Sequence, residues 1–139
     1  MTTAIEPVVY AIQDGCAVIR RGLQTLAAEF PGELAMYARW ALAAIAHGPV
    51  DSIGYIGGGT AVMPRLLKHR ARHHTVYEIE PVIVTTLRVM YPWLNVIEGD
   101  YRDTLRTHHD IIIYDLPGPV PIAQLHAHLN PNGLLAHST

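Results

Sequence analysis

The sequence predicts an α/β protein built on a doubly wound, mainly parallel sheet, with a small N-terminal β-hairpin. Strand-like and helix-like segments alternate from residue 52 onward, and parallel strands need such helical crossovers to return the chain. Residues 111–114 read Ile-Ile-Ile-Tyr, which is typical of a strand buried on both faces. With 139 residues we expect a single domain, in which residues 1–32 form the hairpin region and residues 33–139 form the α/β core.

The amino-acid composition excludes several classes of protein. Hydrophobic residues make up 50% of the chain, charged residues 16%, and the formal net charge is -2. These values indicate neither disorder nor a polyanion-binding tail, so no nucleic-acid partner is indicated. Cys16 is the only cysteine, as expected in a reducing compartment. Glu6 and Pro7 do not fit a secretory signal, and the apolar residues 34–46 are too few to span a bilayer. We expect a cytoplasmic protein that does not enter a membrane.

The first elements are a hairpin and a helix. Residues 8–12 and 17–19 are β-prone and flank Asp14-Gly15, a dipeptide suited to a tight hairpin turn. Residues 33–47 are rich in Ala, Leu and Met with apolar residues at helical spacing, and Gly48-Pro49 ends this helix.

The alternating region follows the same logic of apolar runs separated by turn residues. Pro81 suits the first turn of a helix, and Asn132-Gly133 marks the exit of the last one. The strands are expected at residues 52–56, 75–79, 95–98, 111–114 and 134–137, and the helices at residues 61–72, 81–90 and 121–129.

Three glycines, Gly57, Gly58 and Gly59, follow the first parallel strand directly. Glycine lets the backbone turn sharply and approach a ligand closely, while the next helix offers N–H groups at its positive end. The alternative is a tight strand-to-helix turn that binds nothing.

Acidic residues stand at the ends of the following strands. Glu78 lies about 20 residues after the glycines, where a carboxylate accepts hydrogen bonds from ribose hydroxyls in nucleoside-binding folds. Asp100 follows the third strand, where it could accept from an adenine amino group, and Asp115 follows the fourth and would face the reaction centre. The alternative is that Glu78 and Glu80 form a solvated strand end. Together, four strand ends predict one ligand crevice at the carboxyl edge of the sheet.

Four segments carry a resemblance to a known family. They are GGGTAV at residues 57–62, YEIE at residues 77–80, GDY at residues 99–101 and HDIIIYDLPGP at residues 109–119. In this order they are similar to GGGDGG, a segment containing E-I-D, GDG and YDVIIxDxxDP of the spermidine synthase family. The resemblance implies the Rossmann-like fold of class I methyltransferases, here lacking the C-terminal strands, and a cofactor that is S-adenosylmethionine or its decarboxylated form.

The resemblance also implies roles for individual residues. Glu78 would hold the ribose, Asp100 the adenine amino group, and Asp115 would stand at the position of the catalytic acid. A tyrosine face such as that of Tyr101 could stabilise a sulfonium charge. The full expected cofactor site is Gly57, Gly58, Gly59, Thr60, Glu78, Ile79, Asp100, Tyr101 and Asp115, with Asp115 and Tyr101 as catalytic residues and Tyr37 and Leu116 as substrate-binding residues.

Departures from the family pattern bear on the substrate. Thr60 replaces the glycine-loop aspartate, Gly118 replaces the second aspartate of DxxDP, and Ala38 and Arg39 replace a glutamine and a glutamate. Each change removes an acidic or polar group from the pocket expected to bind a polyamine. Thr60 would also relieve repulsion of a carboxylate, which favours intact S-adenosylmethionine.

Three function classes stay open. The first is a S-adenosylmethionine-dependent transferase acting on a small molecule, by methyl transfer or by reaction of the aminocarboxypropyl arm, including cleavage or cyclisation. The second is a spermidine synthase-like aminopropyltransferase, and the third is a non-catalytic nucleoside- or partner-binding module. The last strand would be an edge that needs covering, so we expect a homodimer or larger homo-oligomer.

Nine histidines invite a metal hypothesis. His126 and His128 would point in different directions on a helix, so we expect surface histidines and no metal site. The pairs His73-His74 and His108-His109 are expected in loops.

Overall fold

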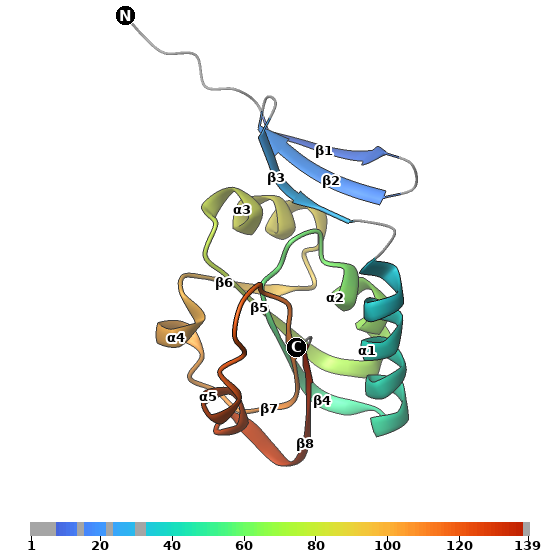
Figure 1. Cartoon of the computed structure of the whole chain (residues 1–139), viewed down its shortest axis with the longest axis vertical. Helices are drawn as coiled ribbons and strands as arrows, with labels where there is room; N and C mark the ends of the chain where they lie inside the picture. The colour runs from blue at the N-terminus through green and yellow to red at the C-terminus, as the bar shows by residue number, and fades with distance from the viewer. Residues whose placement is uncertain (1–7, 14–15, 22–23, 30–32, 138–139) are drawn as a thin grey trace, which may run out of the picture.

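The structure, a computed structural model, describes residues 8–13, 16–21, 24–29 and 33–137. It contains a three-stranded antiparallel sheet and a five-stranded sheet (Figure 1). Among the described residues, no helix has both the length and the apolar character needed to cross a membrane.

The larger sheet has the strand order β6-β5-β4-β7-β8, and all of its pairings are parallel. β4 is therefore central, and the chain winds outward from it in both directions, which confirms the predicted doubly wound sheet. The strands are β4 (Val50–Ile56), β5 (Ala71–Glu78), β6 (Asn95–Glu98), β7 (His109–Tyr114) and β8 (Leu129–His137). β8 forms an edge, and its covering by a second subunit stays a prediction.

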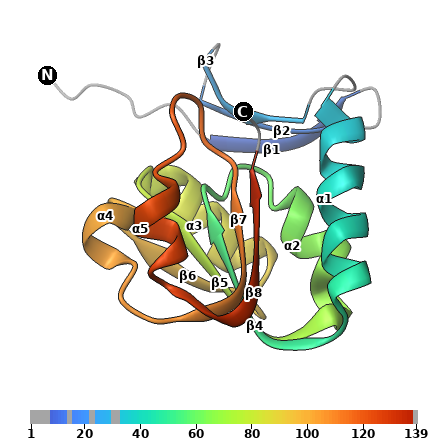
Figure 2. The same cartoon turned by 60° about the horizontal axis from the view of Figure 1, so that its bottom comes forward.

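Helices cover both faces of this sheet (Figure 2). Side chains alternate along β7, so that Ile111 and Ile113 join one core cluster while Ile112 and Tyr114 join the other. This confirms that the strand is buried on both faces. The first cluster packs under α1 (Leu34–His47), α2 (Val62–Leu67) and α3 (Pro81–Met90), and the second lies with α4 (Tyr101–Thr104) and α5 (Ile122–His126).

The N-terminal sheet contains the predicted hairpin and one further strand. β1 (Val8–Gln13) pairs antiparallel with β2 (Cys16–Arg21), while the predicted turn Asp14-Gly15 lies outside the described residues. β3 (Gln24–Ala28) adds to β2. The sequence did not indicate this strand because its residues, QTLAA, lack the β-branched alternation of a strand. The sheet lies beside the glycine-loop end of the larger sheet (Figures 1 and 2).

Several predicted boundaries differ from the structure, and the strands expected from residues 75 and 134 begin at Ala71 and Leu129. The helix expected at residues 61–72 ends at Leu67 and continues only as a 3-10 turn, Lys68–Arg70, before β5 begins. The helix expected at residues 121–129 ends at His126, and β8 begins at Leu129. Asn132, expected at a helix exit, has a φ of 62° inside β8, where the register with β7 shifts. The short helix α4 was not predicted.

Two buried histidines lie in strands, so the expectation of loops was wrong for them. His109 is 2% exposed; its Nδ1 is 2.6 Å from Ser52 Oγ and its Nε2 is 2.7 Å from Tyr77 Oη. His74 Nδ1 is 2.7 Å from the Tyr55 hydroxyl. Burial lowers the pKa of both rings, that of His109 to about 4, so the folded protein holds them neutral.

The buried His109 predicts acid sensitivity of the fold. The unfolded chain takes up a proton on this ring near its usual pKa of about 6.5, but the folded chain does so only near 4. The neutral ring therefore contributes its full stabilising free energy above about pH 6.5, the pKa of the unfolded chain. This contribution is lost as the pH falls toward 4. We expect the unfolding free energy to drop by about 2 kcal/mol from this group between about pH 7 and pH 5, measured by urea denaturation.

A substitution pair tests this assignment. His109→Gln should remove that part of the pH dependence, whereas His126→Gln, at an exposed position of α5, should retain it. An unchanged pH slope in His109→Gln would show that another group causes the acid sensitivity.

Candidate functional site

The carboxyl ends of four parallel strands are joined by backbone hydrogen bonds. Gly57 N donates to Tyr77 O, Gly99 N to Glu78 O and Asp115 N to Ile56 O, each at 2.9 Å. The segments that follow β4, β5, β6 and β7 therefore meet at one edge, as the sequence predicted. Each predicted acidic residue leaves its strand at this edge.

The loop after β4 requires glycine at two positions. Gly57 has a φ of 90°, and a Cβ there would lie 2.8 Å from Asp115 O. A Cβ on Gly58 would lie 2.6 Å from the Leu87 side chain. The loop thus packs tightly against its neighbours, which keeps its main chain at the strand ends.

Glu78 fastens this loop from the adjacent strand. Its Oε1 accepts hydrogen bonds from Gly58 N at 2.9 Å and Gly59 N at 3.4 Å, and its Oε2 accepts from Glu80 N at 3.0 Å. The side chain is 8% exposed. Each carboxylate oxygen has further lone pairs, so Glu78 can accept from a ligand while it holds the loop.

A cavity of about 190 Å³ opens beside Glu78. Ile79 forms part of its outer wall, since it is 64% exposed. The lining brings together six of the predicted site residues with three neighbours: Gly57, Tyr77, Glu78, Ile79, Gly99, Asp100, Tyr101, Arg102 and Leu116. We call it the larger cavity.

Asp100 is engaged by a residue that the sequence did not indicate. Its Oδ1 accepts from Arg102 N at 2.9 Å and from Arg102 Nε at 3.0 Å. These hydrogen bonds lower the pKa of Asp100 to about 2, so the carboxylate is ionised at neutral pH. An amino group of a ligand would have to share Asp100 with Arg102. Tyr101 packs edge-on against Tyr114, with ring centroids 5.9 Å apart.

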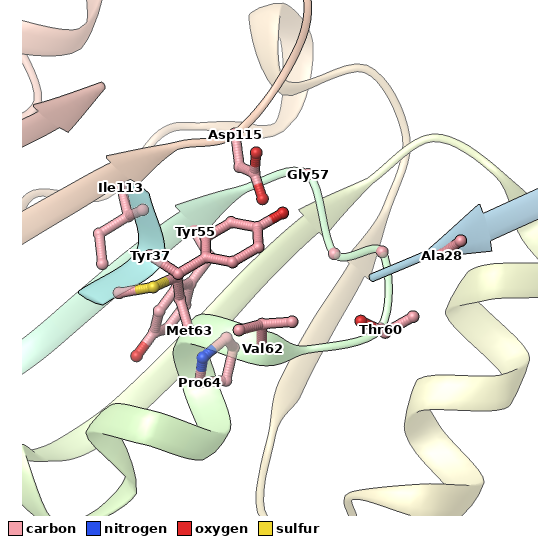
Figure 3. A pocket seen from close by; sticks show the side chains of 12 residues that line it. Ala28, Tyr37, Tyr55, Gly57, Thr60, Val62, Met63, Pro64, Ile113 and Asp115 are labelled. Atoms are coloured by element: carbon pink, nitrogen blue, oxygen red, sulfur yellow. The ribbon is translucent and has the colours of Figure 1, made fainter. Parts of the chain in front are cut away.

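A smaller cavity of about 50 Å³ adjoins the first at Gly57 (Figure 3). This volume holds a few water molecules or a short chain. Five further predicted site residues line it: Tyr37, Gly58, Gly59, Thr60 and Asp115. The remaining lining is Ala28, Tyr55, Gly57, Val62, Met63, Pro64 and Ile113.

One end of the smaller cavity is acidic. The Tyr37 hydroxyl donates to Glu33 Oε2 at 3.0 Å, and burial raises the pKa of Tyr37, which keeps it a donor. Burial first, and then the charge of Glu33, raises the pKa of Asp115 to about 6. Glu33 was not predicted as a site residue. Its spacing of one helical turn from Tyr37 could have indicated it.

At the other end of this cavity Thr60 is bonded to an ion pair that lines a separate cavity. Thr60 Oγ1 donates to Glu29 Oε1 at 3.0 Å, and Arg65 Nη2 donates to the same oxygen. Glu29 follows β3, so the N-terminal sheet contributes directly to this region. Neither Glu29 nor Arg65 was predicted. All of the predicted site residues thus line one of two adjoining cavities, but several of their partners come from unexpected segments.

Comparison with known proteins shows the fold. No family model and no curated protein matches the chain, but many solved structures do. An S-adenosylmethionine-bound amino pentose methyltransferase from Micromonospora echinaspora has a TM-score of 0.61 at 24% identity, covering 76% of this chain and 50% of that one. Trm5b from Pyrococcus abyssi has a TM-score of 0.67 at 18% identity, with 92% and 39% covered. The 23S rRNA methyltransferase ErmE has a TM-score of 0.51 at 24% identity, with 67% and 38% covered.

The chain has the Rossmann-like fold of class I S-adenosylmethionine-dependent methyltransferases. It spans half or less of the length of these three structures.

The role of Glu78 in holding the loop predicts a specific loss of stability. Glu78→Gln weakens hydrogen bonds to a charged acceptor and should lower the unfolding free energy by about 1–3 kcal/mol, measured by urea denaturation. Glu98 is the matched control, because it pairs with Glu78 across β5 and β6 and is exposed. Glu98→Gln should change stability by less than about 0.5 kcal/mol. Equal effects would contradict the structural role of Glu78.

Proposed function

We propose that this chain binds S-adenosylmethionine and transfers a group from it to a small-molecule acceptor. The observation that carries the proposal is the Glu78 carboxylate at the rim of the larger cavity, fastened to the glycine loop where the strands end. A carboxylate there suits ribose hydroxyls, and a crevice at the carboxyl ends of the strands is where this architecture binds ligands. The methyltransferases that share the fold, one of them bound to S-adenosylmethionine, support the choice of cofactor.

The cavities fit the two parts of this cofactor. Ile79, Tyr101 and Leu116 give the larger cavity apolar walls for a purine ring, and Asp100 supplies an acceptor for its amino group. The smaller cavity continues from Gly57 and would take the remainder of the molecule. Gly57 and Gly58 keep the main chain of the loop against the strand ends, because a side chain at either position would strike its neighbours. When bound, the sulfonium supplies the activated alkyl group.

Asp115 would act as the general base. Its carboxylate lines the smaller cavity and is half-buried, and its raised pKa, about 6, brings it close to the range in which proton acceptors work efficiently. Tyr37 would orient the acceptor through its hydroxyl. The proton leaving the acceptor nucleophile would be held on the Asp115 carboxylate.

The acidic end of the smaller cavity favours an acceptor that carries an amine. Glu33 and Asp115 lie close enough for the charge of one to raise the pKa of the other, and a cationic ligand would relieve that repulsion. The same observation supports the second candidate, an aminopropyltransferase that uses decarboxylated S-adenosylmethionine. Glu33 supplies a carboxylate to a pocket in which Thr60 and Gly118 stand where the family has aspartates. Transfer to a larger acceptor such as RNA is a further outcome that the test has to distinguish, since one protein with this fold is an rRNA methyltransferase.

Calorimetric titration tests the proposal, followed by chromatography of the incubated mixtures. The protein should bind S-adenosylmethionine more tightly than the decarboxylated form and release S-adenosylhomocysteine if a methyl group is transferred. Methylthioadenosine would instead indicate reaction of the longer arm. Preference for the decarboxylated compound favours the aminopropyltransferase, binding without product favours a nucleoside-binding module, and binding of neither compound contradicts the proposal.

The raised pKa of Asp115 predicts that the turnover rate rises with pH on the acidic side. Below about 6 the carboxyl is protonated and cannot accept a proton, so turnover should rise about tenfold per pH unit and level off above that value. Glu33→Gln should move the midpoint to lower pH, because a charge that raises the pKa is removed. The control Glu98→Gln should leave it in place.

Asp115→Asn should spare cofactor binding and reduce turnover about 100-fold or more. If the residual turnover of this variant still rose with pH below about 6, Asp115 would not be the base.

A further inference from the structure

The separate cavity lies between α1 and α2, which pack side by side (Figures 1 and 2). Its volume of about 560 Å³ exceeds that of the larger and the smaller cavity. This volume falls within the range of roughly 300–1,000 Å³ that is usual for small-molecule sites. Its lining comes from the two helices and from Glu29, and we call it the interhelical groove.

The lining of the interhelical groove is mostly apolar. Apart from Tyr37 and Arg65, the helices contribute only aliphatic side chains to it: Leu34, Ala38, Ala41, Leu42, Val62 and Leu66. Their spacing of three or four residues places one face of each helix against the groove. Leu42 is 66% exposed and Leu66 is 54% exposed, whereas the outward side of a surface helix usually carries polar residues. Exposed apolar surface of this kind is typical of a binding site.

The groove adjoins the smaller cavity at Tyr37 and Val62, the two residues that line both. The Tyr37 hydroxyl donates to Glu33 Oε2 at 3.0 Å. Burial and the charge of Glu33 raise the pKa of Asp115, and a hydrogen bond from Tyr37 opposes this rise. The hydroxyl therefore lies beside two carboxylates. A ligand that extends from the groove past Tyr37 would meet the acidic end of the smaller cavity.

The charged residues in the lining of the groove are paired with each other. Arg65 Nη2 donates to Glu29 Oε1, which also accepts from Thr60 Oγ1 at 3.0 Å, and both members of the pair line the groove. Their charges offset each other, so the pair offers a cation no net attraction. A cationic group would lose its hydration in the apolar part of the groove, which is unfavourable.

We propose that the interhelical groove holds the apolar body of the acceptor, and that the acceptor is a monoamine whose amino group lies at Tyr37. The inference rests on the proposed function, since it names the class of its acceptor. The carboxylates beside Tyr37 attract the amino group, while Leu34, Leu42 and Leu66 cover the aliphatic or aromatic remainder. A diamine of the same length would place its second ammonium group among these side chains, so the groove selects against polyamines.

Amines that differ only in their apolar part test the inference. Butylamine, hexylamine and octylamine are titrated calorimetrically into the wild-type chain saturated with S-adenosylhomocysteine. The affinity should rise about two- to fourfold for each added methylene group, the gain from burying it. Octylamine should bind about tenfold more tightly than 1,8-diaminooctane. Equal affinities along the series, or tighter binding of the diamine, would overturn the inference.

A variant in the groove tests where the apolar body lies. Leu66→Glu removes apolar surface and supplies an anion to a second ammonium group, so the preference for octylamine over 1,8-diaminooctane should fall about tenfold. The matched control is Ile122→Glu, because Ile122 is 51% exposed on α5 and lines none of the three cavities. The control should keep the preference. An unchanged preference in Leu66→Glu would contradict the assignment of the groove.

Two further measurements separate the alternatives. Both variants should bind S-adenosylhomocysteine within about twofold of the wild-type chain, which also shows that they are folded. Light scattering should give Leu66→Glu the oligomeric state of the wild-type chain; an oligomer that this change dissociates would show that a second copy covers the groove, and would overturn the inference. Binding of S-adenosylhomocysteine without binding of any amine would overturn this inference alone. If the chain bound neither S-adenosylhomocysteine nor S-adenosylmethionine, the proposed function would fail, and this inference with it.

Discussion

The site depends on the bond between Glu78 and the glycine loop. Parallel strands leave their last residues at a common edge, but nothing in the sheet itself fixes the loop that follows the central strand. Glu78 reaches across from β5 and accepts from Gly58 and Gly59, while Gly57 and Gly58 pack too tightly against their neighbours to admit a side chain. These contacts fix the loop against the strand ends. Both cavities meet at its first residue, Gly57.

Charge is divided along these cavities. The larger one is walled largely by apolar groups, with ionised Asp100 held by Arg102. The smaller one has an acidic end, where burial and Glu33 raise the pKa of Asp115, and an opposite end where Thr60 donates to Glu29, which lies outside the lining. A cofactor with a neutral nucleoside and a cationic sulfonium would meet apolar walls with the first part and acidic groups with the second, as the proposed function requires.

Elements outside the parallel sheet determine much of this chemistry. Glu29 follows a strand of the N-terminal sheet, and Glu33 and Tyr37 come from the start of α1. The sheet supplies a crevice at the carboxyl ends of its strands, where many proteins of this architecture bind ligands. The segments packed over its edge supply the groups that would distinguish one cofactor tail or one acceptor from another.

The sequence by itself determined the parallel sheet, the glycine loop and the acidic residues at the strand ends, because each is encoded locally: by alternation of apolar runs, by glycine directly after a strand, and by the residue that ends the next strand. It did not determine β3, the strand positions of His74 and His109, or the partners Glu29, Glu33, Arg65 and Arg102. Glu29 stands 31 residues from Thr60 and 36 from Arg65, and His109 stands 57 from Ser52. Contacts at such separations leave no periodic trace in the sequence, so only tertiary packing decided them. Glu33 and Arg102 are close in sequence to Tyr37 and Asp100, but only the folded chain brings these pairs to the cavities.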